Sequence, residues 1–393
     1  MDTVGFYDPS GAGVPNAAAT IACDGSCLYR CVLPTMPHDA DVIIVGAGLA
    51  GTAAALTLSR NHKVHVLEAD QSASGASGAA AGLVNPFMGR RARPVWRLRE
   101  ALAAVSALLD RADASALFPP QGVLRPVVED DQEAPFRDAA EEHPDLATWL
   151  SPGEVAERHP DVQANGGALF VPKGGAIDVP AMVTALLAAA ERRGATVETN
   201  APALYWRETP SAAVVEVDRG DGTEDLSADR VLLALGQGYP RFPELRRLGL
   251  TGVKGQTVRV RRPAALNGTL PPLSGRGYVV PDGDTLVLGS NYDNNFDDLT
   301  PDPDATAYIR EKTARMVSGV DETEIVDEQA GVRVKYSETN RPLLGPLPRR
   351  DRLWTFTALG SKGLLTAPLL ALDLPEYLQD PTHIPDSIHP PKG

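Results

Sequence analysis

Three glycines and one acidic residue have the types and the spacing of a dinucleotide-binding site. Gly46, Gly48 and Gly51 form a Gly-x-Gly-x-x-Gly turn, and Glu68 follows 20 residues (68 − 48) after the middle glycine. In such a turn the first glycine permits a tight bend, the second lets a pyrophosphate approach the backbone, and the third lets a helix pack closely on a strand. A carboxylate at the position of Glu68 is placed to accept a hydrogen bond from a ribose hydroxyl group. These residues predict that the chain binds a dinucleotide.

The residues around the turn have the order strand, turn, helix, strand that such a site requires. Residues 42–45 are apolar and all β-branched, which is typical of a strand buried on both faces. Residues 53–58 favour a helix, and residues 63–68 predict a second strand that ends on Glu68. The amide groups and the positive dipole end of the helix would then face the phosphates. A purely structural glycine turn beside a surface glutamate is the alternative, and the order of the elements disfavours it.

Length and composition set limits on the fold and on the partners. The 393 residues suggest about two domains at roughly 150 residues each, and a hydrophobic content of 43% is sufficient for a sizeable core. The net charge of −14 opposes non-specific binding to nucleic acid or to anionic lipid. No apolar run approaches the roughly 20 residues of a membrane-spanning helix. All three cysteines precede the nucleotide fold, which favours a reducing, cytoplasmic location.

The first 36 residues have the composition of an irregular extension, rich in glycine, proline and alanine. Within it, Cys23, Cys27 and Cys31 match no common zinc or iron–sulfur spacing, so we predict no metal site. A lipoprotein cleavage site at Cys23 is disfavoured because no positive segment and no apolar run precede it. The position of Met36, just before the fold, leaves open whether residues 1–35 belong to the natural protein.

Residues 72–87 are mostly small in their first two-thirds and follow closely on the predicted ribose-binding acid. We expect their backbone amides to close over a large planar cofactor, and a flexible linker is the alternative. Further along, helices are expected at residues 95–110, 179–193 and 302–317, and residues 118–165 are expected to hold short helices and loops. Strands are expected at residues 166–171, 195–198, 204–206, 213–218, 230–236, 257–260, 278–280 and 285–288. The strand at 230–236 is expected to rejoin the nucleotide-binding sheet, whereas the pattern from residue 252 is antiparallel.

Further motifs follow in order along the chain. They occupy residues 77–82, 174–178 before a helix, 233–236, 255–256, 331–333, 341–345 and 359–363. Together with the glycine turn and Glu68, this series resembles the FAD-dependent D-amino acid oxidase superfamily from about residue 40 to 375, and it is most similar to the glycine/sarcosine oxidase branch. Residues 360–368 also resemble the oxidase domain of the bifunctional enzyme that completes methylaminomethyl-uridine in tRNA.

The resemblance implies an α/β fold, with a Rossmann-like FAD-binding domain and a second, mixed α+β substrate domain built on an antiparallel sheet. The FAD-binding domain would be discontinuous and would comprise residues 37–95, 175–242 and 329–393. The substrate domain would comprise residues 96–174 and 243–328.

The resemblance also implies FAD bound without a covalent link. Glu68 would contact the adenosine ribose, the backbone near Ala203 would lie beside the adenine, and the loop after residue 359 would cover the pyrimidine edge of the flavin. The implied cofactor-binding residues are Gly46, Ala47, Gly48, Gly51, Glu68, Ala69, Ala76, Ser77, Ala81, Gly82, Leu83, Ala203, Gly236, Gly360, Ser361, Lys362, Gly363 and Leu364. A covalent flavin is not expected, because the C-terminal half contains no cysteine and His65 alternates within a strand.

Two residues are implied in catalysis. Arg333 matches the arginine that holds the substrate carboxylate in the glycine oxidase branch, where a guanidinium group forms two parallel, charge-assisted hydrogen bonds. A structural arginine between the domains is the alternative. Lys362 would place a positive charge that favours the anionic reduced flavin. In the alternative for Lys362, the side chain points outward and the amides of its loop contact the flavin.

The implied reaction removes a hydride equivalent from the carbon beside an amine, delivers it to flavin N5 and ends with hydrolysis of the imine. It needs orientation and a neutral amine more than a strong base, and all seven histidines lie outside the flavin loops. We expect a small amine or amino acid as the substrate and oxygen or a quinone as the electron acceptor. The alternatives are a carboxymethylaminomethyl-type tRNA wobble nucleoside, disfavoured by the acidity of the chain, and a flavoprotein without catalytic activity. Substrate, acceptor and oligomeric state are left open by the sequence.

Overall fold

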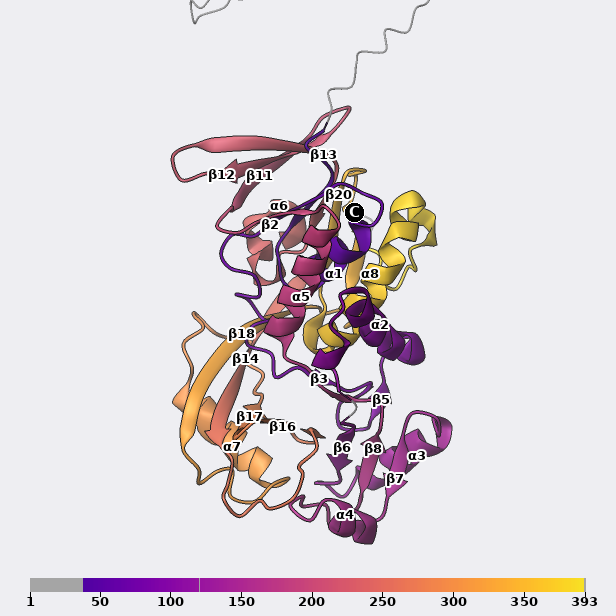
Figure 1. The fold of residues 1–393 in the computed structure, drawn as a ribbon, viewed down its shortest axis with the longest axis vertical. Helices are drawn as coiled ribbons and strands as arrows, with labels where there is room; N and C mark the ends of the chain where they lie inside the picture. Colours follow the sequence, from indigo (N-terminus) through magenta and orange to yellow (C-terminus); the bar gives the residue numbers. More distant parts are fainter. Residues whose placement is uncertain (1–37, 120, 392–393) are drawn as a thin grey trace, which may run out of the picture. The chain divides into compact units, whose positions relative to one another are not determined.

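The computed structural model describes residues 38–119 and 121–391. The chain divides into two units, Met1–Pro37 and His38–Gly393, and the second contains two eight-stranded sheets with their helices (Figure 1). The predicted irregular extension, the three cysteines and Met36 lie outside the described residues.

The first sheet is built around the strand that precedes the glycine turn. β1 (Ala40–Val45) lies between β2 (Val64–Leu67) and β13 (Thr223–Leu233), and both pairs are parallel. Residues 231–233 at the end of β13 also pair in parallel with β20 (Leu353–Thr357). The strand at 230–236 therefore rejoins the nucleotide-binding sheet, as predicted. The remaining strands of this sheet are β10 (Thr196–Glu198), β11 (Ala203–Glu208), β12 (Ala213–Asp218), β19 (Leu343–Pro346) and β20 (Leu353–Thr357).

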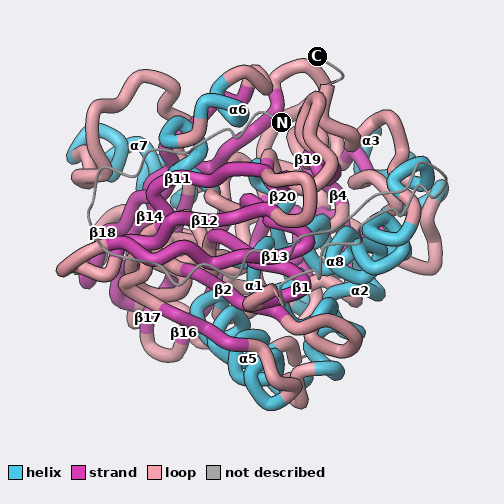
Figure 2. Tube along the Cα trace, turned by 90° about the horizontal axis from the view of Figure 1, so that it is seen from above, coloured by secondary structure: helices cyan, strands magenta, loops and turns pink. Residues whose placement is uncertain are grey.

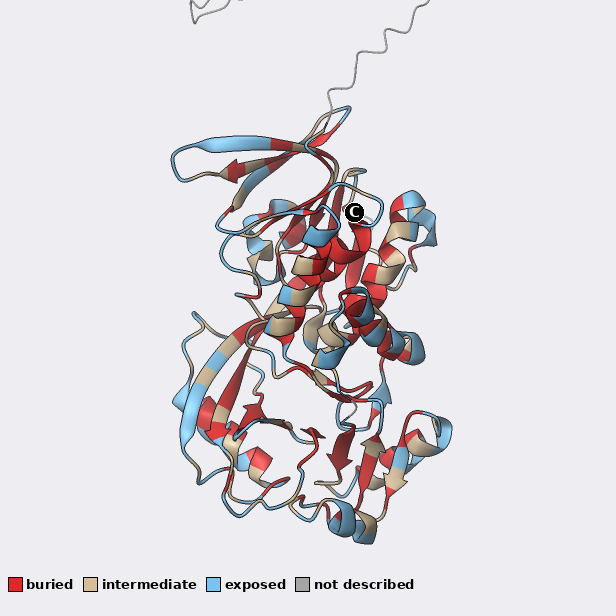
Figure 3. Cartoon of the chain, in the orientation of Figure 1, coloured by how far each residue is buried: buried red, intermediate tan, exposed pale blue. Residues whose placement is uncertain are grey.

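β1 is buried on both faces, as its apolar sequence predicts. Val42 and Ile44 belong to one hydrophobic core, whereas Ile43 and Val45 belong to a second core on the opposite face. Figure 2 shows the helices of the first core on one side of the strands, and α1 is buried along its whole length (Figure 3). These helices are α1 (Leu49–Leu58), α2 (Leu98–Arg111), α5 (Val179–Arg192) and α8 (Gly363–Gln379).

The second sheet is mainly antiparallel. Its longest pair joins β14 (Leu250–Arg261) to β18 (Ile325–Tyr336), and β14 also pairs with β17 (Thr285–Gly289). β16 (Tyr278–Asp282) and β17 form a hairpin at the predicted Asp-Gly turn, and α7 (Pro303–Ala314) packs against β14 and β17. The other strands of this sheet are β6 (Val123–Pro126), β7 (Thr148–Leu150), β8 (Ala168–Val171) and β15 (Leu273–Ser274).

The expected helices and strands are all present, although β13 and β14 each begin seven residues earlier than predicted. The prediction for residues 118–165 was incomplete. This segment contains β6 and β7 in addition to its helices, because both short strands depend on pairing with β8 for their structure. The helix α8 was not predicted. None of the helices in the described part has the length and apolar character that crossing a membrane requires. The remaining elements are β3 (Leu83–Val84), β4 (Phe87–Met88), β5 (Arg93–Pro94), β9 (Gly175–Ala176), α3 (Glu133–Glu142), α4 (Pro152–Arg158) and α6 (Pro243–Arg246).

Candidate cofactor and substrate site

The backbone of the glycine turn accounts for two of its three glycines. Gly46 has a φ of +108°, and a Cβ atom there would lie 2.5 Å from the carbonyl oxygen of Ala234. At Gly51 a Cβ atom would lie 1.8 Å from the carbonyl oxygen of Gly46, which no side chain can tolerate. Gly46 therefore permits the bend and Gly51 permits the helix to pack on the turn, in agreement with the roles assigned from their spacing.

The middle glycine has a different environment. A Cβ atom on Gly48 would meet only the hydroxyl oxygen of Ser77, at an ordinary distance of 3.4 Å. Packing within the chain therefore does not explain a glycine here, whereas the approach of a phosphate group to the start of α1 does. Ser77 accepts a hydrogen bond from the amide of Leu49 at 3.1 Å, so its hydroxyl group lies at the same helix terminus. The turn thus has the features of a phosphate cradle.

Glu68 directly follows β2, and its carboxylate is directed to the turn. One carboxylate oxygen accepts a hydrogen bond from the amide of Ala47 at 2.7 Å, and the other accepts one from Asp70 at 3.1 Å. The side chain is only partly buried, so both oxygens have further lone pairs available. The amide of Ala201 donates to the Glu68 carbonyl oxygen at 2.8 Å, which brings the segment before Ala203 beside the acid.

The small-residue loop is held in place by three parts of the fold. Gly82 has a φ of +74°, and a Cβ atom there would lie 1.7 Å from the Ile177 carbonyl oxygen, beside the pairing of β3 with β9. On the second sheet, a Cβ atom on Gly331 would lie 3.1 Å from the Cα atom of Ala76. Together with Ser77 at the start of α1, these contacts favour an ordered loop over the flexible linker considered from the sequence.

The predicted flavin-covering loop begins α8 and lies beside the glycine turn. A Cβ atom on Gly363 would lie 3.7 Å from the Leu49 side chain, at the first residue of α1. Lys362 is partly buried and donates a hydrogen bond to the carbonyl oxygen of Asn340 at 3.1 Å. Burial, and then the charge of Arg341, lowers the pKa of Lys362. Its ammonium group thus already has a hydrogen-bond partner within the chain. This favours the alternative in which the amides of the loop, and not the Lys362 side chain, contact the flavin.

The other predicted cofactor residues surround the same region with different degrees of exposure. Gly236 lies shortly after β13. Between them, the amide of Ala234 donates a hydrogen bond to the carbonyl oxygen of Val45 at 2.8 Å, which continues the pairing with β1. Of the remaining residues, Ala69, Gly236 and Ser361 are exposed, whereas Ala81, Leu83, Ala203, Gly360 and Leu364 are partly buried.

Arg333, the predicted substrate-binding arginine, lies on β18. Among the described residues, no carboxylate lies within 4.0 Å of its guanidinium group to neutralise the charge. Its guanidinium group donates to the Ser290 hydroxyl at 3.1 Å and to the Asn291 carbonyl oxygen at 2.8 Å. The ring of Tyr292 lies 4.4 Å from its central carbon. A Cβ atom on Gly255 would lie 2.1 Å from one of its nitrogens, so the glycine in the neighbouring strand makes room for the guanidinium group.

The second sheet presents Arg333 on the face that meets the small-residue loop. Arg333 and Gly331 share this face because they are two residues apart on one strand, and Gly331 touches the loop at Ala76. The sheet therefore brings the predicted substrate arginine and the predicted flavin loop to the same side of β18.

A tyrosine that the sequence did not single out belongs to this cluster. Tyr278 lies in register with Gly289, and a Cβ atom on Gly289 would lie 2.2 Å from the Tyr278 hydroxyl oxygen. Burial raises the pKa of Tyr278 to about 12, and Arg333 and a hydrogen bond with Ser290 oppose that rise. Ser290 thus connects Arg333 to Tyr278. The sequence signal for Tyr278 was only its place in a hairpin strand, which carries no chemical information.

Gln256, part of a motif noted in the sequence, has a supporting position. It is fully buried and joins β14 to the start of α7, because its side-chain oxygen accepts from the Asp302 amide at 2.8 Å and its nitrogen donates to Thr306 at 2.6 Å. Its own amide donates to the Asn291 side chain at 2.8 Å. Gln256 therefore holds the segment that supplies Ser290 and Asn291 to Arg333.

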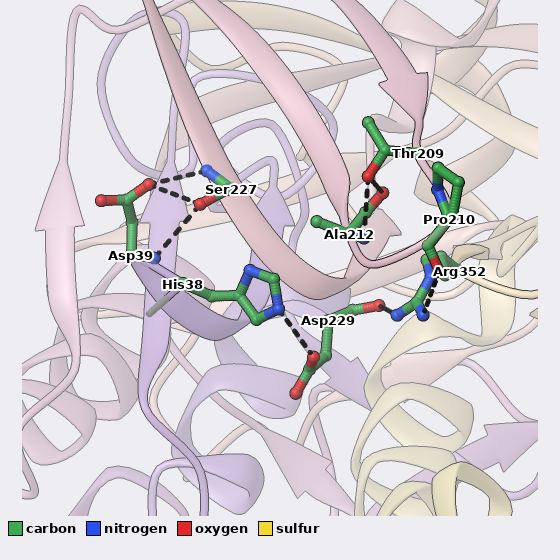
Figure 4. Close-up of polar contacts among 8 residues, drawn as sticks. All are labelled: His38, Asp39, Thr209, Pro210, Ala212, Ser227, Asp229 and Arg352. Carbon is green, nitrogen blue, oxygen red and sulfur yellow. Dashed lines mark hydrogen bonds and ion pairs between the residues drawn. The ribbon is translucent and has the colours of Figure 1, made fainter. Parts of the chain in front are cut away.

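Two cavities, of about 540 and 400 Å³, lie away from this region. The larger is bordered by Asp229, Pro210 and Arg352 at the edge of the first sheet, where Arg352 donates to the carbonyl oxygens of the other two at 3.1 and 3.3 Å (Figure 4). His38 lies 3.4 Å from the Asp229 carboxylate in the same view. Within residues 38–119 and 121–391, no group of three or more His, Cys, Asp or Glu side chains is arranged to hold a metal ion.

A Rossmann-like sheet with a glycine turn, combined with a second antiparallel sheet, is the architecture of a dinucleotide-dependent oxidoreductase. The family model DAO, FAD dependent oxidoreductase, matches residues 41–375, and the chain belongs to this family. Its cofactor is FAD. The open space at Gly48, the carboxylate of Glu68 and the ordered small-residue loop fit that cofactor.

Two curated relatives illustrate the range of the family. The glycine oxidase of Geobacillus kaustophilus is 27% identical over 357 residues, covering 86% of this chain and 92% of that protein. The tRNA 5-methylaminomethyl-2-thiouridine biosynthesis bifunctional protein MnmC of Idiomarina loihiensis is 30% identical over 339 residues, covering 84% of this chain and 54% of that protein. The chain thus spans about half the length of this bifunctional relative.

Solved structures share the fold. The crystal structure of glycine oxidase from Geobacillus kaustophilus matches with a TM-score of 0.76 at 24% identity, covering 87% of this chain and 95% of that chain. The crystal structure of iminodiacetate oxidase from Chelativorans sp. BNC1 matches with a TM-score of 0.74 at 21% identity, covering 89% and 98%. These likenesses show that the mixed α/β architecture predicted from the sequence is correct.

Proposed function

We propose that the chain oxidises the carbon–nitrogen bond of a small amino acid, or of an amine that carries a carboxylate. The observation that carries this proposal is that Arg333 has neutral hydrogen-bond partners and faces the small-residue loop. Two of its five N–H donors are engaged, by a hydroxyl and a carbonyl oxygen that leave its positive charge in place, and it lies on the face of β18 that meets the small-residue loop. A guanidinium group in that state is suited to bind a carboxylate by two parallel hydrogen bonds.

On the cofactor side, the backbone from Gly46 to Gly51 would hold the pyrophosphate of FAD, and Glu68 would accept a hydrogen bond from the adenosine ribose. Ser77 and Gly82 would line the path of the cofactor towards the flavin end, where the amides of residues 360–364 would cover the ring edge. In this arrangement the first sheet is the FAD-binding part and the second sheet is the substrate-binding part. The domain boundaries given above remain a prediction.

When bound, FAD would supply the oxidising power for removal of a hydride equivalent from the carbon beside the amine. The chain supplies orientation. Arg333 would hold the substrate carboxylate, and the hydroxyl group of Tyr278, joined to Arg333 through Ser290, would donate a hydrogen bond to the same carboxylate. Since the pKa of Tyr278 is raised to about 12, the hydroxyl group remains protonated and a donor at neutral and mildly alkaline pH. The position of the amine is then set by its attachment to the bound carboxylate.

The proposal is tested by adding glycine, sarcosine, proline and D-amino acids to the FAD-loaded protein without oxygen and following the flavin absorption band. At least one of these compounds is expected to bleach the band. Arg333→Met is expected to lower kcat/KM by about two to four powers of ten, because two hydrogen bonds to a charged group contribute about 1.5–3 kcal/mol each.

The matched control is Arg261→Met, which removes an arginine from the far end of β14, where it pairs with Asp284 at 2.7 Å. This variant should react like the wild type. No bleaching by any compound of the panel would contradict the proposed reaction. Equal rates in the Arg333 and Arg261 variants would contradict the role of Arg333.

A second candidate substrate is a carboxymethylaminomethyl-type wobble nucleoside in tRNA, favoured by the 30% identity with the bifunctional tRNA protein. The net charge of −14 opposes it, because RNA binding depends on neutralising phosphates. Filter binding of unmodified and modified tRNA over a range of salt concentrations decides between the two. Salt-dependent retention of tRNA would support the nucleoside, and its absence would exclude it.

Two further properties are proposals of the same kind. Oxygen or a quinone would take the electrons, and oxygen consumption compared with reduction of a quinone separates these acceptors. A cytoplasmic location is proposed from the cysteine pattern of the sequence. A flavoprotein that turns over nothing is the remaining alternative, and bleaching by any substrate of the panel would exclude it.

A further inference from the structure

A buried lysine lies behind the proposed carboxylate site. Lys312, on α7, is only 5% exposed, and its ammonium group donates a hydrogen bond to the carbonyl oxygen of Ser290. The side chain runs past Gly277, where a Cβ atom would lie 3.0 Å from the Lys312 Cε atom. The ring of Tyr308 lies 4.6 Å from its nitrogen. Among the described residues no carboxylate lies within 4.0 Å of this ammonium group.

The charged groups around Lys312 do not neutralise it. Burial, and then the positive charges of Arg276 and Arg333, lowers the pKa of Lys312 from 10.5 to about 8. Arg276 has its own partner in Glu129, at 3.0 Å. On the face of β18 towards α7, the carboxylate of Glu328 accepts hydrogen bonds from a threonine and a glutamine. Lys312 and Arg333 therefore remain as two cations whose partners are neutral.

Both cations meet at one residue. Arg333 donates to the Ser290 hydroxyl at 3.1 Å, and Lys312 donates to the carbonyl oxygen of the same serine. Ser290 also forms a hydrogen bond with Tyr278. Keeping two like charges partly buried and close together is unfavourable for the free protein, and the arrival of an anion offsets that cost.

We propose that Lys312 is the second positive charge of the substrate-carboxylate site and a positioning residue for it. The proposal rests on the function proposed above for Arg333. Through Ser290, Lys312 fixes the hydroxyl group that joins Arg333 to Tyr278, and its charge adds to the attraction that Arg333 exerts on the substrate. It does not contact the substrate, since its ammonium group is directed to a backbone carbonyl oxygen.

The test measures binding of acetate to the FAD-saturated full-length protein by isothermal titration calorimetry, from about pH 6 to about pH 10, where the acetate carboxyl group stays ionised. Acetate has no amine, so its own ionisation cannot produce a change in this range. We expect the affinity of the wild type to fall about tenfold as the pH rises through about 8, because Lys312 then loses its proton. Arginine groups keep their charge over this range.

Four variants separate charge from hydrogen bonding. Lys312→Met should bind acetate about tenfold more weakly than the wild type at neutral pH, without a pH dependence. Lys312→Gln, which keeps a donor but no charge, should also be independent of pH, and Lys312→Arg should keep its affinity at alkaline pH. The matched control is Lys254→Met, because Lys254 is 6% exposed and also donates to a carbonyl oxygen, that of Thr300 at 2.7 Å. This control should retain the pH dependence of the wild type.

The outcomes distinguish the inference from the proposed function. If Lys312→Met binds acetate with the affinity and the pH dependence of the wild type, while Arg333→Met does not bind, the inference is wrong and the function proposed for Arg333 stands. If acetate binds equally well to the wild type and to Arg333→Met, the function proposed for Arg333 fails and the inference fails with it. Retention of FAD and the circular dichroism spectrum show for each variant that it is folded.

Discussion

Replacing Lys312 by methionine is expected to stabilise the protein near neutral pH, although it weakens carboxylate binding. Burial, with Arg276 and Arg333, lowers the pKa of Lys312 from 10.5 to about 8. At about 1.4 kcal/mol for each pH unit, this difference corresponds to about 3 kcal/mol by which the charged lysine destabilises the native state. Methionine has a similar shape and no charge, but it cannot donate to the Ser290 carbonyl oxygen, which costs about 1–2 kcal/mol. The expected net gain is about 1–2 kcal/mol.

The sign of the pH dependence follows from the lowered pKa. Between about pH 8 and about pH 10.5 the unfolded chain keeps a proton on Lys312 that the native protein has lost, so the free energy of unfolding of the wild type rises with pH. The destabilisation is fully present below about pH 8 and vanishes near pH 10.5. The advantage of Lys312→Met over the wild type should therefore shrink across this window and end as a disadvantage of about 1–2 kcal/mol, the value of the lost hydrogen bond.

The assay is urea denaturation of the two FAD-saturated proteins at a series of pH values, followed by circular dichroism. Only the difference between them matters, because all other lysines and tyrosines titrate equally in both. A constant difference over the whole pH range would refute the reasoning, since it would mean that the charge on Lys312 carries no cost. Lys312→Arg serves as the control, because it keeps a positive charge at every pH and should be the least stable variant at alkaline pH.

The glycines of the two halves of the site give the remaining predictions. Gly51→Ala would place a methyl group 1.8 Å from the Gly46 carbonyl oxygen and should lower the melting temperature strongly. Gly48→Ala should leave the melting temperature of the apoprotein unchanged. It should weaken FAD binding by about tenfold or more, as measured by fluorescence titration. An equal loss of stability in both variants would contradict the separate roles. Gly255→Ala would displace only the end of the flexible Arg333 side chain, so the protein should fold and keep FAD while KM for a carboxylate substrate rises about tenfold or more. An unchanged KM would show that Arg333 can move without consequence.

The cofactor half of the site could be predicted because its parts are close together in the sequence. The apolar run, the three glycines and the acid all lie between residues 42 and 68, and each constraint acts on near neighbours. The Cβ atom that Gly51 cannot accommodate would meet the carbonyl group of Gly46, and the Glu68 carboxylate accepts from the amide of Ala47. Local spacing therefore contains the information that determines this geometry.

The substrate half could not be predicted from spacing. Tyr278, Ser290, Lys312 and Arg333 lie on four different segments, and they meet because β14, β16, β17 and β18 pair in one particular register. Arg333 was identified only through resemblance to a family. Nothing in the sequence distinguishes Lys312 from the other polar residues of its predicted helix. For the same reason the strands β6 and β7 were missed, since three or four residues have no recognisable periodicity without their partner strand.

The exposure of Arg333 distinguishes it from the buried Arg125 of the same sheet. Arg125 is 1% exposed and donates to the carbonyl oxygens of Phe87 and Gly89, while the ring of Phe136 lies 4.8 Å from its central carbon. Burial lowers the pKa of Arg125 to about 10, which is the cost of enclosing a charge to hold one loop in place. Arg333 has equally neutral partners but is only partly buried, on the face that meets the small-residue loop. The enclosed Arg125 cannot contact an anion, whereas the partly exposed guanidinium group of Arg333 can. In a chain with a net charge of −14, only such contact-range cations can offset the repulsion that a carboxylate substrate meets.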